Sequence, residues 1–104
     1  MANNKSNPGR LKRVWDKTKG VCAHCGRPAS RRTQTVDHFV PRSKGGGYDI
    51  RNLMPLCLDC NRERGTSWIN PYEYYKFAPK SVIHKCIDYS EDLKAKYRTM
   101  SDME

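Results

Sequence analysis

Two Cys-x-x-Cys pairs constrain the fold of this sequence more than any other feature. Cys22 and Cys25 form the first pair, Cys57 and Cys60 form the second, and 31 residues lie between the pairs. Each pair offers two thiolates from a tight turn, and four thiolates complete the tetrahedral shell that Zn²⁺ prefers. Because such a shell has no open position, the spacing predicts a structural zinc site. A redox pair and unrelated free thiols are the alternatives.

The chain is short enough that a structural metal is expected to add to its stability. A chain of 104 residues buries only about 60–65% of its unfolded surface, so a metal is expected to add to a small core. The sequence has neither an apolar run long enough to cross a membrane nor a basic-then-apolar leader, so we expect a soluble, cytoplasmic protein. In a reducing cytosol cysteines serve as metal ligands more often than as disulfides. The fifth, Cys86, is expected to pack in the core.

Positive charge is concentrated in the first third of the chain. The formal net charge is +9, and residues 1–32 hold nine Lys and Arg residues against the single acid Asp16. A basic third on a nearly neutral remainder suggests a polyanionic partner, although a solubilising surface is the alternative. The candidate nucleic-acid contacts are Arg10, Lys12, Arg13, Lys17, Arg27, Arg31, Arg32 and, further along, Arg64. Contacts of this kind predict a steep salt dependence and loose sequence specificity.

Hydrophobic periodicity and turn residues predict the order of the elements. We expect helices at 10–19, 59–64, 70–77 and 81–100, with strands at 33–40 and 53–56 and a glycine-rich loop at 43–48. The domain plan is a flexible tail at 1–9 and one domain at 10–104. Within that domain, 22–65 is the core and the helical segment 70–100 covers it.

An ordered set of polar residues lies between and just after the cysteine pairs. It reads Asp37-His38, then Pro41-x-Ser43-x-Gly45-Gly46, then Asn52-Leu53, and finally Cys60-Asn61-x-x-Arg64-Gly65. In this order and spacing, residues 22–65 resemble the HNH endonucleases. The resemblance implies an α+β fold, with a small ββα-metal nuclease core stapled by a four-cysteine zinc site and flanked by N- and C-terminal helices.

The resemblance also implies a role for each residue. The position of His38 is that of the general base, Asp37 and Asn61 bind a catalytic Mg²⁺ or Mn²⁺, and Asn52 braces the loop that orients the histidine. Hydrolysis of a phosphodiester needs such a base and a hard cation with oxygen ligands. Asn61 stands where the family pattern has its last histidine, which favours an oxygen-preferring ion. Arg64 stands where lysine is more usual.

Taken singly, each of these residues has a structural explanation, such as a helix cap for Asn61. Because neighbours on a strand face opposite sides, Asp37 and His38 serve one site only if the strand ends or bulges there. Together, the residues predict a metal-dependent endonuclease with a one-metal mechanism that cleaves DNA. A zinc-stabilised DNA-binding module without catalysis and a degenerate nuclease that binds proteins are the alternatives. The family is typical of phages and mobile elements, and we favour a monomer without membrane contact.

Overall fold

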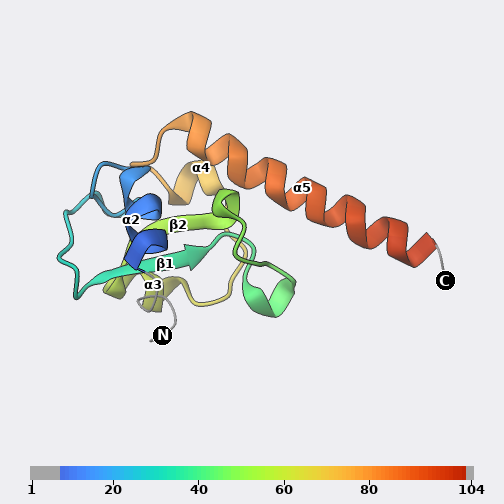
Figure 1. Cartoon of the computed structure of the whole chain (residues 1–104), viewed down its shortest axis with the longest axis horizontal. Helices are drawn as coiled ribbons and strands as arrows, with labels where there is room; N and C mark the ends of the chain where they lie inside the picture. Colours follow the sequence, from blue (N-terminus) through green and yellow to red (C-terminus); the bar gives the residue numbers. More distant parts are fainter. Residues whose placement is uncertain (1–7, 103–104) are drawn as a thin grey trace.

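The computed structural model describes residues 8–102, with side chains up to residue 97, as a β-hairpin set among helices (Figure 1). The two strands are antiparallel and form the whole sheet, and α3 follows them directly, as a ββα unit requires. This is the α+β class expected from the sequence. With η for a 3-10 helix, the elements are α2 (Pro8–Asp16), β1 (Gln34–His38), η1 (Arg42–Lys44), η2 (Ile50–Asn52), β2 (Leu53–Cys57), α3 (Leu58–Arg64), α4 (Pro71–Tyr74) and α5 (Lys80–Asp102).

The register of the hairpin separates two sets of functional residues. Gln34 pairs with Cys57 at one end of the sheet, and His38 pairs with Leu53 at the other. At about 3.4 Å per residue, the four steps along β1 span roughly 14 Å. The second cysteine pair therefore begins at one end of the hairpin, and the Asp-His pair lies at the opposite end.

Helices cover both faces of the hairpin. Both α2 and α3 contact both strands, and Figure 1 shows α2 crossing in front of the strands while α3 lies behind them. Residues 35–38 and 53–56 are consequently all buried. A strand covered on both sides does not alternate between buried and exposed residues, so the polar side chains of β1 must find their partners inside the protein.

The first helix begins earlier than expected. Pro8 and Gly9 were assigned to a flexible tail, but α2 starts at Pro8, where the fixed φ of proline suits the first helical position. The helix ends at Asp16, and turns continue the chain from there. Its apolar side is buried, and the indole N–H of Trp15 donates to the carbonyl of Thr35 at 2.9 Å. The rest of the expected tail, residues 1–7, lies outside the described residues.

The short helix α4 has the cap that its sequence predicts. The side chain of Asn70 accepts hydrogen bonds from the backbone N–H groups of Tyr72 and Glu73, and Pro71 is the first helical residue. The helix ends at Tyr74, sooner than the expected end near residue 77. Tyr75 then turns into the core, where it is fully buried.

Only the first part of α5 covers the core as predicted. Ile83, Cys86 and Tyr89 are buried, so Cys86 packs as expected, but Tyr97 is half exposed. In Figure 1 the C-terminal half of α5 extends beyond the rest of the protein. None of the helices within residues 8–102, α5 included, is both long and apolar enough to cross a membrane.

Candidate active site

The four paired cysteines converge on one point. The Sγ atoms of Cys22, Cys25, Cys57 and Cys60 all lie within 4.8 Å of one another, and those of Cys25 and Cys57 are 4.0 Å apart. In a tetrahedral thiolate site with Zn–S bonds of about 2.3 Å, neighbouring sulfurs lie roughly 3.8 Å apart. The cysteines therefore fit a single metal ion, which they can hold with no position left open.

Local geometry explains how each pair presents its thiols. Gly26 closes the first turn with φ of 76°, and its N–H donates to the carbonyl of Cys22 at 2.9 Å. The N–H of Ala23 donates to the carbonyl of Pro55 at 2.8 Å, which ties this turn to β2. Cys57 ends β2, and α3 begins at the next residue. The metal site thus joins α3 and β2 to the segment that follows α2.

Asp37 lies in an internal ion pair at the other end of the hairpin. Its Oδ1 is 2.6 Å from Nη1 of Arg64, and its Oδ2 accepts a hydrogen bond of 2.6 Å from the hydroxyl of Tyr75. The Asp37 side chain is only 4% exposed. Burial raises the pKa of this carboxyl, and the charge of Arg64 acts against that rise. The carboxylate is therefore held by both a cation and a hydroxyl group.

The spacing of α3 against β1 explains this pairing. Asn61 and Arg64 lie one helical turn apart, while Thr35 and Asp37 share one face of the strand. The Nδ2 of Asn61 donates to Thr35 Oγ1 at 2.7 Å and to the carbonyl of Val36 at 3.2 Å. The structure therefore brings the two predicted ligands of the catalytic ion, Asp37 and Asn61, to the α3 side of β1.

Arg64 is an interior residue and not an exposed phosphate contact. Besides Asp37, its guanidinium donates to the carbonyls of His38 at 2.6 Å, Phe39 at 2.8 Å and Ser67 at 3.1 Å. The residue is 5% exposed. The prediction of nucleic-acid contact from its charge does not agree with this burial. Arg64 instead holds the backbone where β1 ends.

His38 has a different environment from its neighbour. The residue is 9% exposed, and its Nε2 is buried without a hydrogen-bond partner among the described residues. Its ring packs edge-on against Tyr48, with the ring centroids 4.9 Å apart. Burial lowers the pKa of His38 to about 4, assisted by the charges of Arg42, Arg10 and Arg64. At neutral pH the imidazole is therefore uncharged.

Asn52 ties the glycine-rich loop to the end of β1. The side chain is fully buried; it accepts from the N–H of Val40 at 2.8 Å and donates to the carbonyls of Val40 at 3.2 Å and Gly47 at 3.0 Å. The chains approach so closely that a Cβ on Gly46 would lie 1.7 Å from the Val40 oxygen. Only glycine permits this approach, which positions the loop near His38.

The predicted nucleic-acid contacts do not all face solvent. Lys17 points inward, where its Nζ donates to the carbonyls of Ile50 at 2.5 Å and Leu53 at 2.7 Å, and burial lowers its pKa. Lys12 is exposed and pairs with Asp16 at 2.9 Å. Arg10 is half-buried, and its guanidinium lies over the ring of Tyr48. The other members of the set, all exposed, are Arg13, Arg27, Arg31 and Arg32.

The side chains on the α3 side also fit a hard cation by their chemistry. An ionised carboxylate offers about four lone-pair sites, of which Arg64 and Tyr75 occupy two on Asp37. Metal-binding carboxylates commonly keep such hydrogen-bond partners. Because the amide nitrogen of Asn61 donates to β1, its amide oxygen is the atom left for a cation. The positive charge of Arg64 opposes the binding of a cation at Asp37, so Arg64 and a metal ion would compete for this carboxylate.

Comparison with known proteins agrees with this geometry. Residues 22–67 match the HNH endonuclease family, so this part of the chain is an HNH endonuclease domain. The chain is 38% identical over 47 residues to a CRISPR-associated endonuclease Cas9 of Corynebacterium diphtheriae, and 32% identical over 56 residues to the type IV methyl-directed restriction enzyme EcoKMcrA of Escherichia coli. These matches cover 44% and 48% of this chain.

The relatives are much longer proteins. The matches span 4% of the first and 20% of the second. The likeness therefore supports a nuclease function for this domain, but it does not transfer the activity of either whole relative.

Sequence reasoning assigned no role to three residues that contact the candidate site. Tyr75 binds Asp37, while Tyr48 and Arg42 lie beside His38. Tyr48 follows three glycines. These glycines were the one feature of the sequence that indicated a close approach of this segment to another group.

Proposed function

We propose that this protein is a metal-dependent endonuclease that hydrolyses phosphodiester bonds of DNA, with His38 as the general base. The state of His38 is the observation that supports the proposal most strongly. A buried nitrogen without a hydrogen-bond partner costs free energy. Among the described residues the Nε of Arg64 is also buried without one, but that guanidinium is bound through Nη1 and Nη2, whereas Nε2 of His38 is a possible proton acceptor. A catalytic base needs such a nitrogen free to accept a proton.

The residues around His38 suit this role. In the proposal, Nε2 accepts a proton from a water molecule as the water oxygen bonds to phosphorus. The low pKa of His38 keeps the imidazole uncharged at neutral pH, which is the form that accepts a proton. Arg64 binds the His38 carbonyl and Asn52 binds the backbone two residues further on. These contacts keep the imidazole in place.

Two metal ions belong to the proposal. Asp37 and Asn61 would hold Mg²⁺ or Mn²⁺, which stabilises negative charge on the leaving oxygen when it is bound. The four cysteines would hold Zn²⁺, whose closed shell makes it structural. Exposed arginines such as Arg13 would contact DNA phosphates, which carry no sequence information. We therefore propose low sequence specificity.

Nicking of supercoiled plasmid by the zinc-loaded protein, with Mg²⁺ or Mn²⁺ added, tests the proposal. We expect His38→Ala to lose about 10²- to 10⁴-fold in rate, which is the usual contribution of a general base. His84→Ala is the matched control, because His84 is exposed on α5 and should cut like the wild type.

Other outcomes separate the rival functions. Cleavage by His38→Ala at the wild-type rate would exclude His38 as the base. A wild type that shifts DNA in a gel without metal and never cuts it would be a DNA-binding module. A wild type that neither cuts nor shifts DNA would favour a protein-interaction module.

A further inference from the structure

Two arginines from distant parts of the chain meet at one aromatic ring beside His38. The guanidinium carbon of Arg10, on α2, lies 4.6 Å from the ring centroid of Tyr48, and that of Arg42 lies 5.0 Å from it. Arg42 also donates from Nη1 to the hydroxyl of Tyr48 at 2.9 Å. The same ring packs edge-on against His38. We call Arg10, Arg42 and Tyr48 the arginine cluster.

The chemistry of the arginine cluster fits a phosphodiester group. A guanidinium stacked on a ring keeps its N–H groups at its edges, where they can bind phosphate oxygens in pairs. The charges of Arg10 and Arg42 both reach His38. An anion held at the cluster would thus lie beside the ring that packs against His38.

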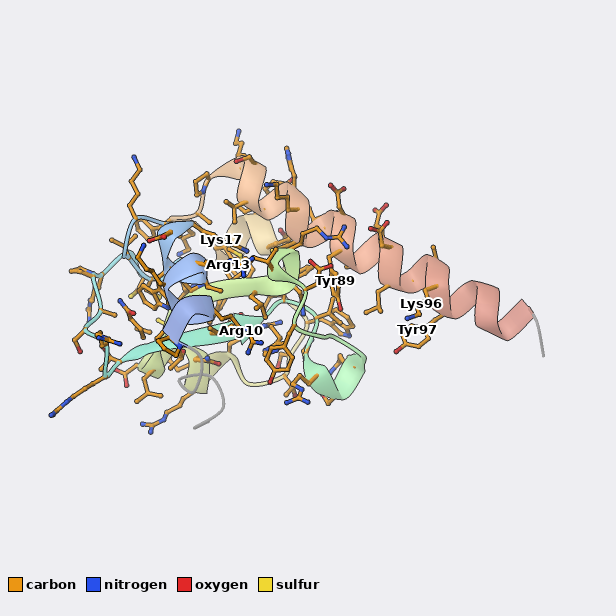
Figure 2. The ribbon with its side chains drawn as sticks, in the orientation of Figure 1. Arg10, Arg13, Lys17, Tyr89, Lys96 and Tyr97 are labelled. Carbon is orange, nitrogen blue, oxygen red and sulfur yellow. The ribbon has the colours of Figure 1, made fainter. Side chains whose placement is uncertain are left out.

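The helix α5 fixes the loop that carries two members of the cluster. The hydroxyl of Tyr89 accepts a hydrogen bond from the N–H of Gly47 at 2.9 Å. Tyr97 packs so closely on Gly45 that a Cβ there would lie 2.8 Å from its hydroxyl. Figure 2 shows Arg10 on α2 and both tyrosines on α5. The cluster is therefore assembled by α2, the loop and α5 together.

From this arrangement we infer that Arg10 and Arg42, held by Tyr48, bind the phosphodiester group that is presented to His38. The inference rests on the proposed function for its catalytic part, but not for its binding part. It also assigns a role to α2 and α5, which lie outside residues 22–67. Both helices would be needed to bind the phosphodiester group, because α2 supplies Arg10 and α5 positions the loop that carries Arg42 and Tyr48.

Binding to DNA tests the inference without requiring cleavage. The salt dependence of affinity is measured by fluorescence anisotropy on a short labelled DNA duplex, with no divalent ion added. The slope of log K against log salt is negative, and we expect Arg10→Gln and Arg42→Gln each to reduce its magnitude by about 1, as the loss of a phosphate contact does. Lys80→Gln is the control for charge, because Lys80 is exposed at the start of α5.

Variants of Tyr48 and a kinetic measurement sharpen the test. Tyr48→Leu removes the ring under both arginines and should lower the slope by a similar amount. Tyr48→Phe keeps the ring and should stay close to the wild type. In plasmid cleavage, Arg10→Gln and Arg42→Gln should lower kcat as well as raise KM, because a misplaced phosphate reacts slowly. Loss of Arg31, an exposed contact before β1, should raise KM alone.

Each outcome bears on one claim. If Arg10→Gln and Arg42→Gln change the slope no more than Lys80→Gln does, the inference is wrong. If they change it while the wild type never cuts DNA, the phosphate site stands and the proposed nuclease function fails. Arg10→Lys tests whether the effect of Arg10→Gln comes only from lost packing. Because lysine keeps the charge, this variant should retain part of the affinity. A slope equal to that of Arg10→Gln would indicate a packing effect and overturn the inference.

Discussion

The two ends of the hairpin differ in how completely their polar groups are satisfied. At the cysteine end, four thiols converge within 4.8 Å and can close a complete shell around one ion. At the histidine end, Asp37 has two partners, whereas the Nε2 of His38, on the next residue, has none among the described residues. One end can be satisfied by a single ion, and the other leaves one buried nitrogen without a hydrogen-bond partner.

The reason for the difference lies in the faces of β1. Asp37 points to the side of α3, where the helix supplies Arg64 and the following segment supplies Tyr75. His38 meets Tyr48, with two arginines over that ring. A set of cations beside an imidazole disfavours its protonation and supplies no acceptor for it. The buried ion pair of Asp37 and the unpartnered nitrogen of His38 therefore belong to adjacent residues of the strand.

The largest effect is expected from loss of the cysteine end. Cys57→Ser should release the metal and unfold the domain, because structural zinc contributes about as much free energy as a small domain has in total. Metal content and circular dichroism measure this outcome. Cys86→Ala is the control, since Cys86 lies outside the cluster and should keep the metal. A folded, metal-free Cys57→Ser protein would show that the hairpin does not depend on that end.

Loss of the buried cation should cost less. Arg64→Met leaves Asp37 buried without its ion pair and should lower the free energy of unfolding by about 3–5 kcal/mol, as measured by urea denaturation. Adding Asp37→Asn should restore part of this loss, because a neutral amide no longer needs the cation. Arg62→Met is the control, because Arg62 is exposed on the same helix and its loss should change stability little. Equal losses in the two arginine variants would contradict the buried pair.

The hydroxyl of Tyr75 gives a smaller and more specific effect. Tyr75→Phe removes a 2.6 Å hydrogen bond to Asp37 and keeps the buried ring, so we expect a loss of about 1.5–3 kcal/mol. Tyr72→Phe should have no measurable effect, since Tyr72 is exposed. If Tyr75→Phe is as stable as the wild type, Arg64 alone holds Asp37.

The smallest effect concerns pH and reports on His38. Its pKa is lowered to about 4 in the folded protein and is near 6.5 in the unfolded chain. Between these values the unfolded chain binds the proton more readily, so stability should fall as pH decreases through this window. We expect a loss of about 1 kcal/mol from pH 7 to 5.5 in the wild type that is absent in His38→Gln, which keeps the same cysteines. Parallel curves for the two proteins would mean that His38 is not protected from protonation.

Local patterns were sufficient for most of the secondary structure. The cysteine spacing predicted the cluster, residue types and turn residues predicted both strands, and Asn70 predicted its own cap. The cap, the strands and each single cysteine pair depend on neighbours within a few residues, and the metal chemistry of four thiols predicted that the two pairs meet. The extent of α5 was predicted as well, but not that its second half leaves the core, because helical periodicity does not tell where the covered surface ends.

The direction of the charged side chains was not predictable in this way. Charge alone placed Lys17 and Arg64 on a DNA-binding surface, yet both donate to buried carbonyl groups. The cost of leaving those carbonyls unpaired outweighs the usual exposure of a basic residue. Which carbonyls lack partners depends on how the hairpin, the loop and the helices meet.

The sequence by itself determined that this chain carries two Cys-x-x-Cys pairs and an Asp-His pair at the end of a strand, because spacing and residue type are local properties. The tertiary structure alone decided which of the polar groups at that strand end are satisfied. Asp37 acquires Arg64 from α3, while His38 acquires Tyr48 from the loop and the charge of Arg10 from α2. These partners are distant along the chain from Asp37 and His38. The packing of helices and the loop on the two faces of the hairpin brings them together.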